Sequence, residues 1–342
     1  MIHAKRIVLM ALSLLFLFIR VLAHGDELNI KPELLTKILA GKGEGELGFR
    51  ESRGGGEGDT SPTPPAFFND EIYIFDNLNW RICIFDLEMN YRREIRITGN
   101  KTSNSLQAAK LYVFENGDFS TSRSELLRIG KNGDYIYGIQ HDLFPRNLTL
   151  DGEYYLFHDY VVYQKDNGEL GAIDSNGKFL SNEETRVLHQ DLLETNTLQK
   201  ESPNLWNAIT RFLSENNLVL VNDRFLSNRP KDYFDLYRII RDNSSVQPKQ
   251  SILDAKLRES SGYLYGFDND HNSYWQFSIK SGQKEIITVF VVSRFGEIIN
   301  RFRIDGNGYP IISPSGDVYL VEEKFEKNSQ VVFLYYRVKR KW

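Results

Sequence analysis

The stretch Glu71-Ile-Tyr-Ile-Phe-Asp-Asn-Leu-Asn-Trp-Arg-Ile-Cys-Ile-Phe-Asp86 decides the fold of this chain. It contains two short runs of β-branched and aromatic residues, 72–75 and 82–85, separated by a polar turn. A third run, 92–97, follows after two further turn residues. Runs of this length, joined by tight turns, predict three antiparallel strands in succession.

Weaker copies of the same strand pattern recur along the chain. A period of about 40–50 residues with strand content is typical of propeller blades. Asn-Gly, Asp-Gly and Ser-Gly pairs lie between the runs and predict hairpins with two-residue loops, because glycine readily adopts a positive φ angle. The sequence therefore predicts an all-β fold, a six-bladed β-propeller. The copies are centred on Tyr73, Tyr112, Tyr155, Val219, Tyr265 and Tyr319.

The widest gap between copies predicts a small helical insertion at about 183–216, between blades 3 and 4. Ser181 and Glu184 have the spacing of a capping box, in which each side chain satisfies a backbone N–H of the other residue. Ser202 and Pro203 suit the N-cap and first position of a second helix. Apolar residues follow each start at helical spacing: Val187, Leu188 and Leu192, then Leu205, Ile209, Phe212 and Leu213.

Residues 1–23 predict a signal peptide that is cleaved after Ala23. Lys5 and Arg6 precede a largely apolar run, 7–19, as in a secretory leader. A run of this length rises only about 20 Å as a helix, which is short of the ~30 Å hydrocarbon core of a bilayer. We therefore expect a protein that is periplasmic or secreted and has no transmembrane anchor after cleavage.

Charge and cysteine content narrow the class of protein. The chain has a formal net charge of −4, and loss of the leader removes three positive residues and no acid, which gives −7. A mildly acidic body argues against a broad nucleic-acid surface. Cys83 is the only cysteine, so the chain can form no internal disulfide, and its isoleucine neighbours predict a buried free thiol.

Residues 71–86 resemble the NHL repeat of β-propellers, and the resemblance covers residues 40–97. The chain is also similar to uncharacterised exported NHL-type proteins of bacteria such as spirochaetes. The resemblance implies a six-bladed propeller in which residues 34–40 form the outer strand of the last blade, whose inner strands come from 309–338. It also implies that Asp76 and Arg81 fix a turn. The matching motif is Asp76-x-x-Asn79-x-Arg81-Ile82, followed by Phe85-Asp86.

No motif of a common catalytic or cofactor-binding class is present. Residues 43–48 match Gly-x-Gly-x-x-Gly but lead into a glycine triplet rather than a helix, so we expect no bound dinucleotide. His141-Asp142 and His158-Asp159 are interpreted as polar turn residues rather than as a metal or acid–base site. Residues 268–272 superficially resemble a calcium loop but lack its glycine and its final acid, so turn chemistry explains them better.

A candidate ligand surface follows from the propeller itself. The loops between the second and third strands of every blade emerge on one face, around the central channel. Mixed aromatic and charged residues there predict a binding surface, the alternative being six ordinary solvated turns. By strand register the candidates are Trp80, Phe119, His158, Asp223, His271 and Lys324.

We therefore expect an exported, monomeric, non-enzymatic propeller that binds a protein, peptide or glycan and no nucleic acid. The alternative is a metal-dependent hydrolase or lactonase-type propeller that holds one Ca²⁺ or Zn²⁺ in its channel. Such a site needs Glu, Asn and Asp side chains from several blades. Sequence spacing does not show their convergence, so no catalytic, metal-binding or cofactor-binding residue is assigned.

Overall fold

The structure is a computed structural model that describes most of the chain between residues 28 and 340. The expected signal peptide, 1–23, lies outside the described residues. The described residues are 28–30, 32–51, 60–99, 108–123, 125–140, 155–157, 159–164, 170–194, 203–215, 219–221, 224–226, 235, 239, 262–270, 272–281, 284–293, 298–304, 309–325 and 331–340.

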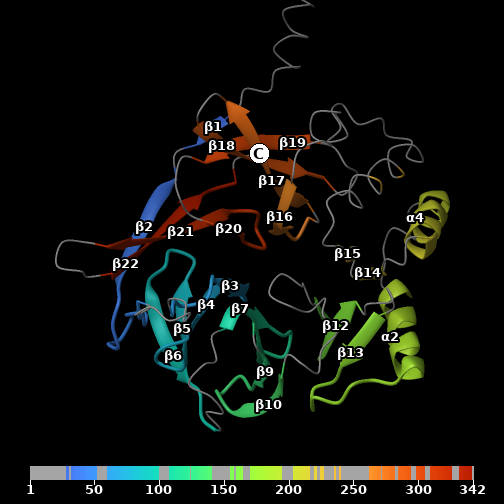
Figure 1. Cartoon of the computed structure of the whole chain (residues 1–342), viewed down its shortest axis with the longest axis horizontal. Coiled ribbons are helices and arrows are strands. Elements are labelled where there is room, and N and C mark those ends of the chain that lie inside the picture. The colour runs from blue at the N-terminus through green and yellow to red at the C-terminus, as the bar shows by residue number, and fades with distance from the viewer. Residues whose placement is uncertain are drawn as a thin grey trace, which may run out of the picture.

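The described strands form six separate sheets that lie around a common centre (Figure 1). Sheet I contains β3 (Ala66–Phe68), β4 (Glu71–Asp76), β5 (Arg81–Asp86) and β6 (Tyr91–Arg96). Sheet II contains β7 (Ala108–Val113), β8 (Phe119–Arg123), β9 (Glu125–Ile129) and β10 (Tyr135–Gln140). Sheet III contains β11 (Tyr155–Phe157), β12 (Tyr160–Gln164) and β13 (Leu170–Ile173), and sheet IV contains β14 (Val219–Val221) and β15 (Arg224–Leu226).

Two further sheets complete the circuit. Sheet V contains β16 (Gly262–Phe267), β17 (Ser273–Ser281), β18 (Lys284–Val292) and β19 (Ile298–Ile304). Sheet VI contains β20 (Tyr309–Ile312), β21 (Val318–Phe325) and β22 (Val331–Val338). The innermost strands of neighbouring sheets contact one another, as β16 contacts β20 and β3 contacts β7. The chain is thus an all-β propeller, and the three strands expected at 72–97 are present as β4, β5 and β6.

The N-terminal segment supplies a strand to each of two sheets. β2 (Glu33–Leu39) pairs antiparallel with β22 in sheet VI, and Lys37 lies opposite Leu334. This is the pairing that the resemblance to the NHL repeat implies for residues 34–40. β1 (Leu28–Ile30), which no sequence pattern predicts, pairs parallel with β19 as a fifth strand of sheet V. One short segment therefore ties two neighbouring sheets together.

Apolar side chains fill the spaces between consecutive sheets. Each of four buried clusters draws residues from two neighbours, so the sheets V, VI, I, II and III pack face to face in that order. This radial stacking hides the sheet faces and leaves only short edges at the rim. Representative pairs are Tyr274 and Leu320 (V and VI), Cys83 and Phe333 (VI and I), Ile84 and Phe119 (I and II), and Leu126 and Val161 (II and III).

The hairpin turns lie where Asn-Gly and Ser-Gly pairs predict them, but the expected two-residue loop is wrong. At 114–118, Phe114 donates its N–H to the carbonyl of Asp118 at 2.8 Å, and Gly117 donates to the carbonyl of Phe114 at 2.9 Å. This is a three-residue loop, a type I turn followed by one left-handed residue. The same bonds and a positive φ recur at Gly133, Gly177 and Gly316. The pairs Asp151-Gly152 and Asn167-Gly168 lie outside the described residues.

The helical insertion consists of α2 (Asn182–Glu194) and α4 (Pro203–Glu215), which lie between β13 and β14 in the chain. The capping box is present: Ser181 donates its N–H to Oε2 of Glu184 at 2.8 Å, and Glu184 donates its N–H to Oγ of Ser181 at 3.2 Å. Leu188 is buried, but Val187 is 47% exposed, so its expected place on the packed face is wrong. Of the helices that the structure describes, none has the length and hydropathy to cross a bilayer.

A substitution in β2 tests how much its packing contributes to stability. Ile38 is 6% exposed, whereas Leu34 on the same strand is 53% exposed. We expect Ile38→Ala to lower the free energy of unfolding by about 2–4 kcal/mol through loss of buried volume. Leu34→Ala, the matched control, should cost less than about 1 kcal/mol. Urea denaturation measures the free energy of unfolding of both variants. Equal losses in the two variants would contradict the packing of β2 through Ile38.

Candidate functional site

Trp80 lies in the turn between β4 and β5, at the predicted loop face, and its contacts are those of a turn residue. Its φ angle is 57°, its N–H donates to the carbonyl of Asp76 at 2.9 Å, and its carbonyl accepts the N–H of Ile97 at 3.2 Å. The indole packs edge-on against Phe75, with ring centroids 5.4 Å apart. The side chain is therefore half-buried against its own sheet.

Phe119 does not lie on that face. It is the first residue of β8 and follows the turn at 114–118, which joins the first and second strands of sheet II. That turn lies at the opposite end of the sheet from the loop between the second and third strands. The side chain is only 1% exposed. The prediction for Phe119 was wrong because it treated Tyr73 and Tyr112 as equivalent positions of two blades. Tyr73 lies in the second strand of sheet I, whereas Tyr112 lies in the first strand of sheet II. Lys324 is exposed near the end of β21. The remaining candidates, His158, Asp223 and His271, lie outside the described residues.

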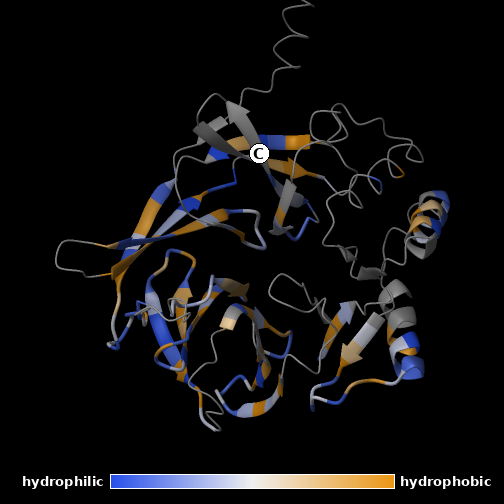
Figure 2. Ribbon diagram, viewed as in Figure 1, coloured by the Kyte–Doolittle hydropathy of each residue, from blue (hydrophilic) through white to orange (hydrophobic). Residues whose placement is uncertain are grey.

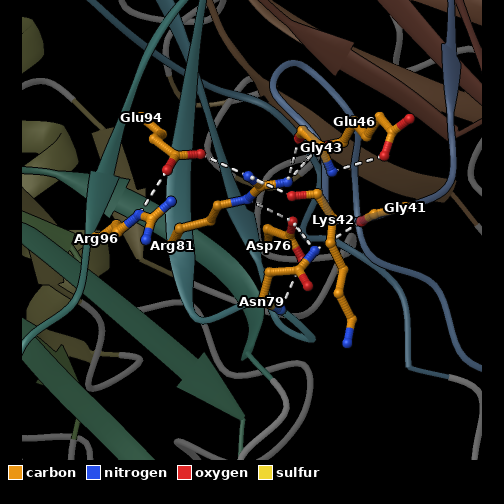
Figure 3. Close-up of polar contacts among 9 residues, drawn as sticks. All are labelled: Gly41, Lys42, Gly43, Glu46, Asp76, Asn79, Arg81, Glu94 and Arg96. Carbon is orange, nitrogen blue, oxygen red and sulfur yellow. Dashed lines mark hydrogen bonds and ion pairs between the residues drawn. The ribbon is translucent and has the colours of Figure 1, made fainter.

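Arg81 lies at the centre of a polar cluster between sheet I and the loop that follows β2 (Figure 3). Its Nε donates to Oδ2 of Asp76 at 3.0 Å, and its Nη1 donates to Oε2 of Glu94 at 2.6 Å. Its other donors reach backbone carbonyls: Lys42 at 3.4 Å, Gly43 at 3.1 Å and Glu46 at 2.8 Å. We call this cluster the Arg81 clasp.

The Arg81 clasp is a closed structural site. A guanidinium has five N–H donors, and all five are occupied here. The Arg81 side chain is 5% exposed, and that of Asp76 is fully buried. A Cβ on Gly48 would lie 2.5 Å from Oδ1 of Asp76, so only glycine allows the loop to approach this closely. A ligand would have to displace an existing bond, and the cluster therefore fixes the loop rather than binding a substrate.

The carboxylate of Asp268 likewise accepts hydrogen bonds from its own turn and from the strand that follows it. Oδ1 accepts the N–H groups of Asp270 at 3.0 Å and Asn272 at 2.9 Å, and Oδ2 accepts the hydroxyl of Tyr274 at 3.0 Å. This agrees with turn chemistry rather than a calcium loop. Across the described ranges, no three His, Cys, Asp or Glu side chains are grouped to hold a metal. Of the two His–Asp pairs, only Asp159 falls within those ranges.

Cys83 is buried in the cluster between sheets VI and I, as its isoleucine neighbours predict. Burial raises the pKa of its thiol to about 12. The thiolate is the reactive form of cysteine, so this residue is no candidate nucleophile at neutral pH.

A surface cavity of about 630 Å³ lies between sheets I and II, and we call it the β6 groove. The strand β6 forms one wall. It is the last strand of its sheet and is mostly hydrophilic (Figure 2). Turns of sheet II form the other wall, and two nearly buried rings lie beneath. The lining residues are Arg93, Glu94, Ile95 and Arg96 of β6, Gly117, Lys131 and Asn132 of the turns, and the rings of Tyr73 and Phe119.

One end of the groove carries an ordered charge network. Arg93 donates from Nη1 and Nη2 to the two carboxylate oxygens of Glu71, at 2.6 and 3.1 Å. The hydroxyl of Tyr73 donates to Oε2 of Glu71 at 2.7 Å. The hydrogen bond from Arg93 lowers the pKa of Glu71, while burial and the bond to Glu71 raise the pKa of Tyr73 to about 12. Arg93 is therefore held in place and the phenol stays neutral at pH 7.

Cationic donors dominate the rest of the groove. The Lys131 side chain is exposed, and its ammonium has no ion-pair partner among the described residues. Its backbone N–H donates to Oδ1 of Asp118 at 3.0 Å, which fixes the turn. The Arg96 side chain is 82% exposed and pairs with Glu94 at 2.8 Å. The arrangement can bind an anionic group, and it contains no paired nucleophile and base.

The β6 groove is absent from the sequence-based candidates. Its walls come from 93–96 and from 117–132, and no motif spans both. The available signal is the strand 91–96 itself, in which three of six residues are arginine. Such a charged strand is typical of a sheet edge.

Comparison with known proteins does not assign this chain to a family. No family model matches the sequence, and no curated protein matches it. A solved member of the DUF4221 family from Bacteroides vulgatus aligns with 92% of this chain and 99% of its own, at 12% identity and a TM-score of 0.41. A protein from Bacteroides fragilis aligns over 93% and 98% at 8% identity and 0.38. Regucalcin, a calcium-binding protein from Agrobacterium tumefaciens, aligns over 90% and 95% at 9% identity and 0.31.

All three TM-scores are below 0.5, so these likenesses assign neither a family nor a function. The class of protein, an all-β propeller, rests on the sheets and inter-sheet packing of this chain. The resemblance of residues 40–97 to the NHL repeat stays a prediction.

Removing the central arginine tests the structural role of the clasp. We expect Arg81→Met to lower the free energy of unfolding by about 3–5 kcal/mol, because it leaves the buried Asp76 carboxylate without its ion pair. Arg96→Met, which removes an exposed arginine of the same cluster, should cost less than about 1 kcal/mol. Urea denaturation compares the two variants. If Arg81→Met lowers the free energy of unfolding no more than Arg96→Met does, the Arg81 clasp does not have this structural role.

Proposed function

We propose that this protein is an exported, six-bladed, NHL-like propeller that acts as a non-enzymatic binding or scaffold module for a protein, peptide or glycan. The observation that carries the proposal is the β6 groove. It offers exposed cationic donors beside an anchored Arg93–Glu71 pair, and the Lys131 ammonium has no partner among the described residues.

The six-blade count is supported by six separate sheets. Four of these sheets have four or five strands, and the described strands of the other two number three and two. Sheets III and IV flank the helical insertion in the chain and would be the third and fourth blades. The ends of the chain would then close the ring through β2 and β22.

Export is supported by the sequence of the leader. Cleavage after Ala23 would leave four residues before β1, so the mature chain would begin close to its first strand. A monomeric protein in the periplasm or outside the cell fits a fold that closes on itself through its own termini.

The metal content of the purified protein distinguishes the binding role from the enzyme alternative. We expect purified mature protein to contain no stoichiometric Ca²⁺ or Zn²⁺ by mass spectrometry, and its melting temperature to be unchanged by a chelator. A bound metal that is lost to the chelator together with thermal stability would favour the metal-dependent hydrolase or lactonase-type propeller instead.

The groove itself is tested by a ligand panel with matched lysine variants. The panel contains acidic, neutral and basic peptides and neutral and uronic-acid oligosaccharides, read by thermal shift. We expect at least one member to raise the melting temperature, and Lys131→Gln to reduce that shift. Lys324→Gln makes the same change at the predicted loop face and should leave it intact. If Lys324→Gln is the damaging variant, the loop face is the binding surface and the groove is not.

A further inference from the structure

We propose that the ligand of the β6 groove is an acidic peptide segment that binds in extended conformation along the outer edge of β6. This inference rests on the proposed function and names the chemistry of its ligand. Three properties of the groove support it: its charge, its free strand edge, and the burial of its aromatic rings.

The charge of the groove opposes that of the whole chain. Three of the nine lining residues are cationic and only one is acidic, whereas the full chain has a net charge of −4. Arg93 is held by Glu71 with its side chain still 52% exposed, so its guanidinium is pre-positioned rather than buried. Carboxylates at an oppositely charged groove gain both association rate and orientation.

The edge of β6 can accept another strand. β6 is the terminal strand of sheet I, and within the described residues no strand pairs with its outer side. Ile97 donates its N–H to Trp80 at 3.2 Å, in register with the β5–β6 ladder. Because backbone groups alternate in an antiparallel ladder, the N–H and C=O of Glu94 then point outward. An extended peptide can pair with these groups by strand addition.

The free edge has a defined end. Thr98 donates its N–H to the carbonyl of Gly133 at 2.9 Å, and Tyr135 donates to the carbonyl of Thr98 at 3.0 Å. A Cβ on Gly133 would overlap the carbonyl oxygen of Arg96, so sheet II already covers this part of the strand. A bound peptide would stop at Arg96 and run back past Glu94 to Arg93, where a β-bulge interrupts the ladder.

The burial of the rings favours a peptide over a glycan. Sugars are commonly held by stacking on an exposed aromatic face, and here Tyr73 is 6% exposed and Phe119 is 1% exposed. The accessible donors are charged side chains and, along β6, outward backbone groups. These are the partners of acidic side chains and of an extended main chain.

Fluorescence anisotropy with a labelled peptide of alternating glutamate and threonine tests this ligand on the mature full-length protein. We expect saturable binding that weakens as salt rises, because the contacts are exposed ion pairs. Replacing the glutamates by glutamine should weaken binding about tenfold. Methylating alternate backbone nitrogens should also cost about tenfold, because it removes the main-chain donors of an added strand.

Matched variants localise the site. Lys131→Gln should weaken the peptide about fivefold, as expected for one exposed ion pair, and Lys324→Gln should leave it unchanged. Absence of binding, or equal binding of the methylated peptide, would overturn strand addition by an acidic peptide. A uronic-acid oligosaccharide that binds more tightly and depends on Lys131 would overturn the peptide while the groove remains the binding surface. Binding of the peptide that ignores Lys131 but not Lys324 would overturn both.

Discussion

The pairing of β2 with β22 is the constraint on which the rest of the propeller depends. Sheets that stack radially hold each neighbour only through their faces, so the two sheets at the chain ends separate unless something joins them. Here the N-terminal strand completes the C-terminal sheet, and its Ile38 enters the cluster shared with sheet I. β1 extends the same tie to sheet V. Neither end of the chain can leave without exposing a strand edge and a sheet face.

The residues that follow β2 explain why the closure holds its geometry. The loop that begins at Gly41 offers carbonyl groups to Asn79 and Arg81 of sheet I, and Leu47 is fully buried. At the same boundary between sheets VI and I, which we call the seam, Arg337 of β22 donates to both carboxylate oxygens of Glu88, at 2.8 and 2.7 Å. The seam between sheets VI and I thus combines an apolar core with a buried arginine cluster and a bidentate ion pair. Sheets I and II share an apolar core but leave their outer parts apart, and the β6 groove lies there.

Local patterns in the sequence predicted local structure well, because each depends on a few adjacent residues. The meander at 72–97, the capping box at Ser181, the helix start at Pro203 and the positions of the Asn-Gly turns all belong to this group. The closing strand at 34–40 was implied by the resemblance to the NHL repeat rather than by a local pattern. The surface chemistry was not predictable. Aligning Tyr112 with Tyr73 shifted sheet II by one strand, and this error placed the buried Phe119 on a solvent face.

The remaining misses share a physical cause: they depend on contacts between distant segments. β1 is only three residues long, and its parallel partner lies more than 270 positions away. The walls of the β6 groove come from an edge strand and from turns of the next sheet. The exposure of Val187 depends on how α2 lies against its neighbours, because helical spacing alone admits either residue of the Val187–Leu188 pair as the buried one.

Thiol labelling of Cys83 tests the central claim directly, because this single cysteine lies in the cluster that β2 closes. Its labelling rate in native buffer reports how often the seam between sheets VI and I opens. We expect Ile38→Ala to accelerate labelling about a hundredfold, as a loss of roughly 3 kcal/mol implies. Ile209→Ala, an equally buried aliphatic substitution in α4, should leave the rate nearly unchanged. Equal acceleration by both variants, or none by Ile38→Ala, would show that β2 does not hold the seam shut.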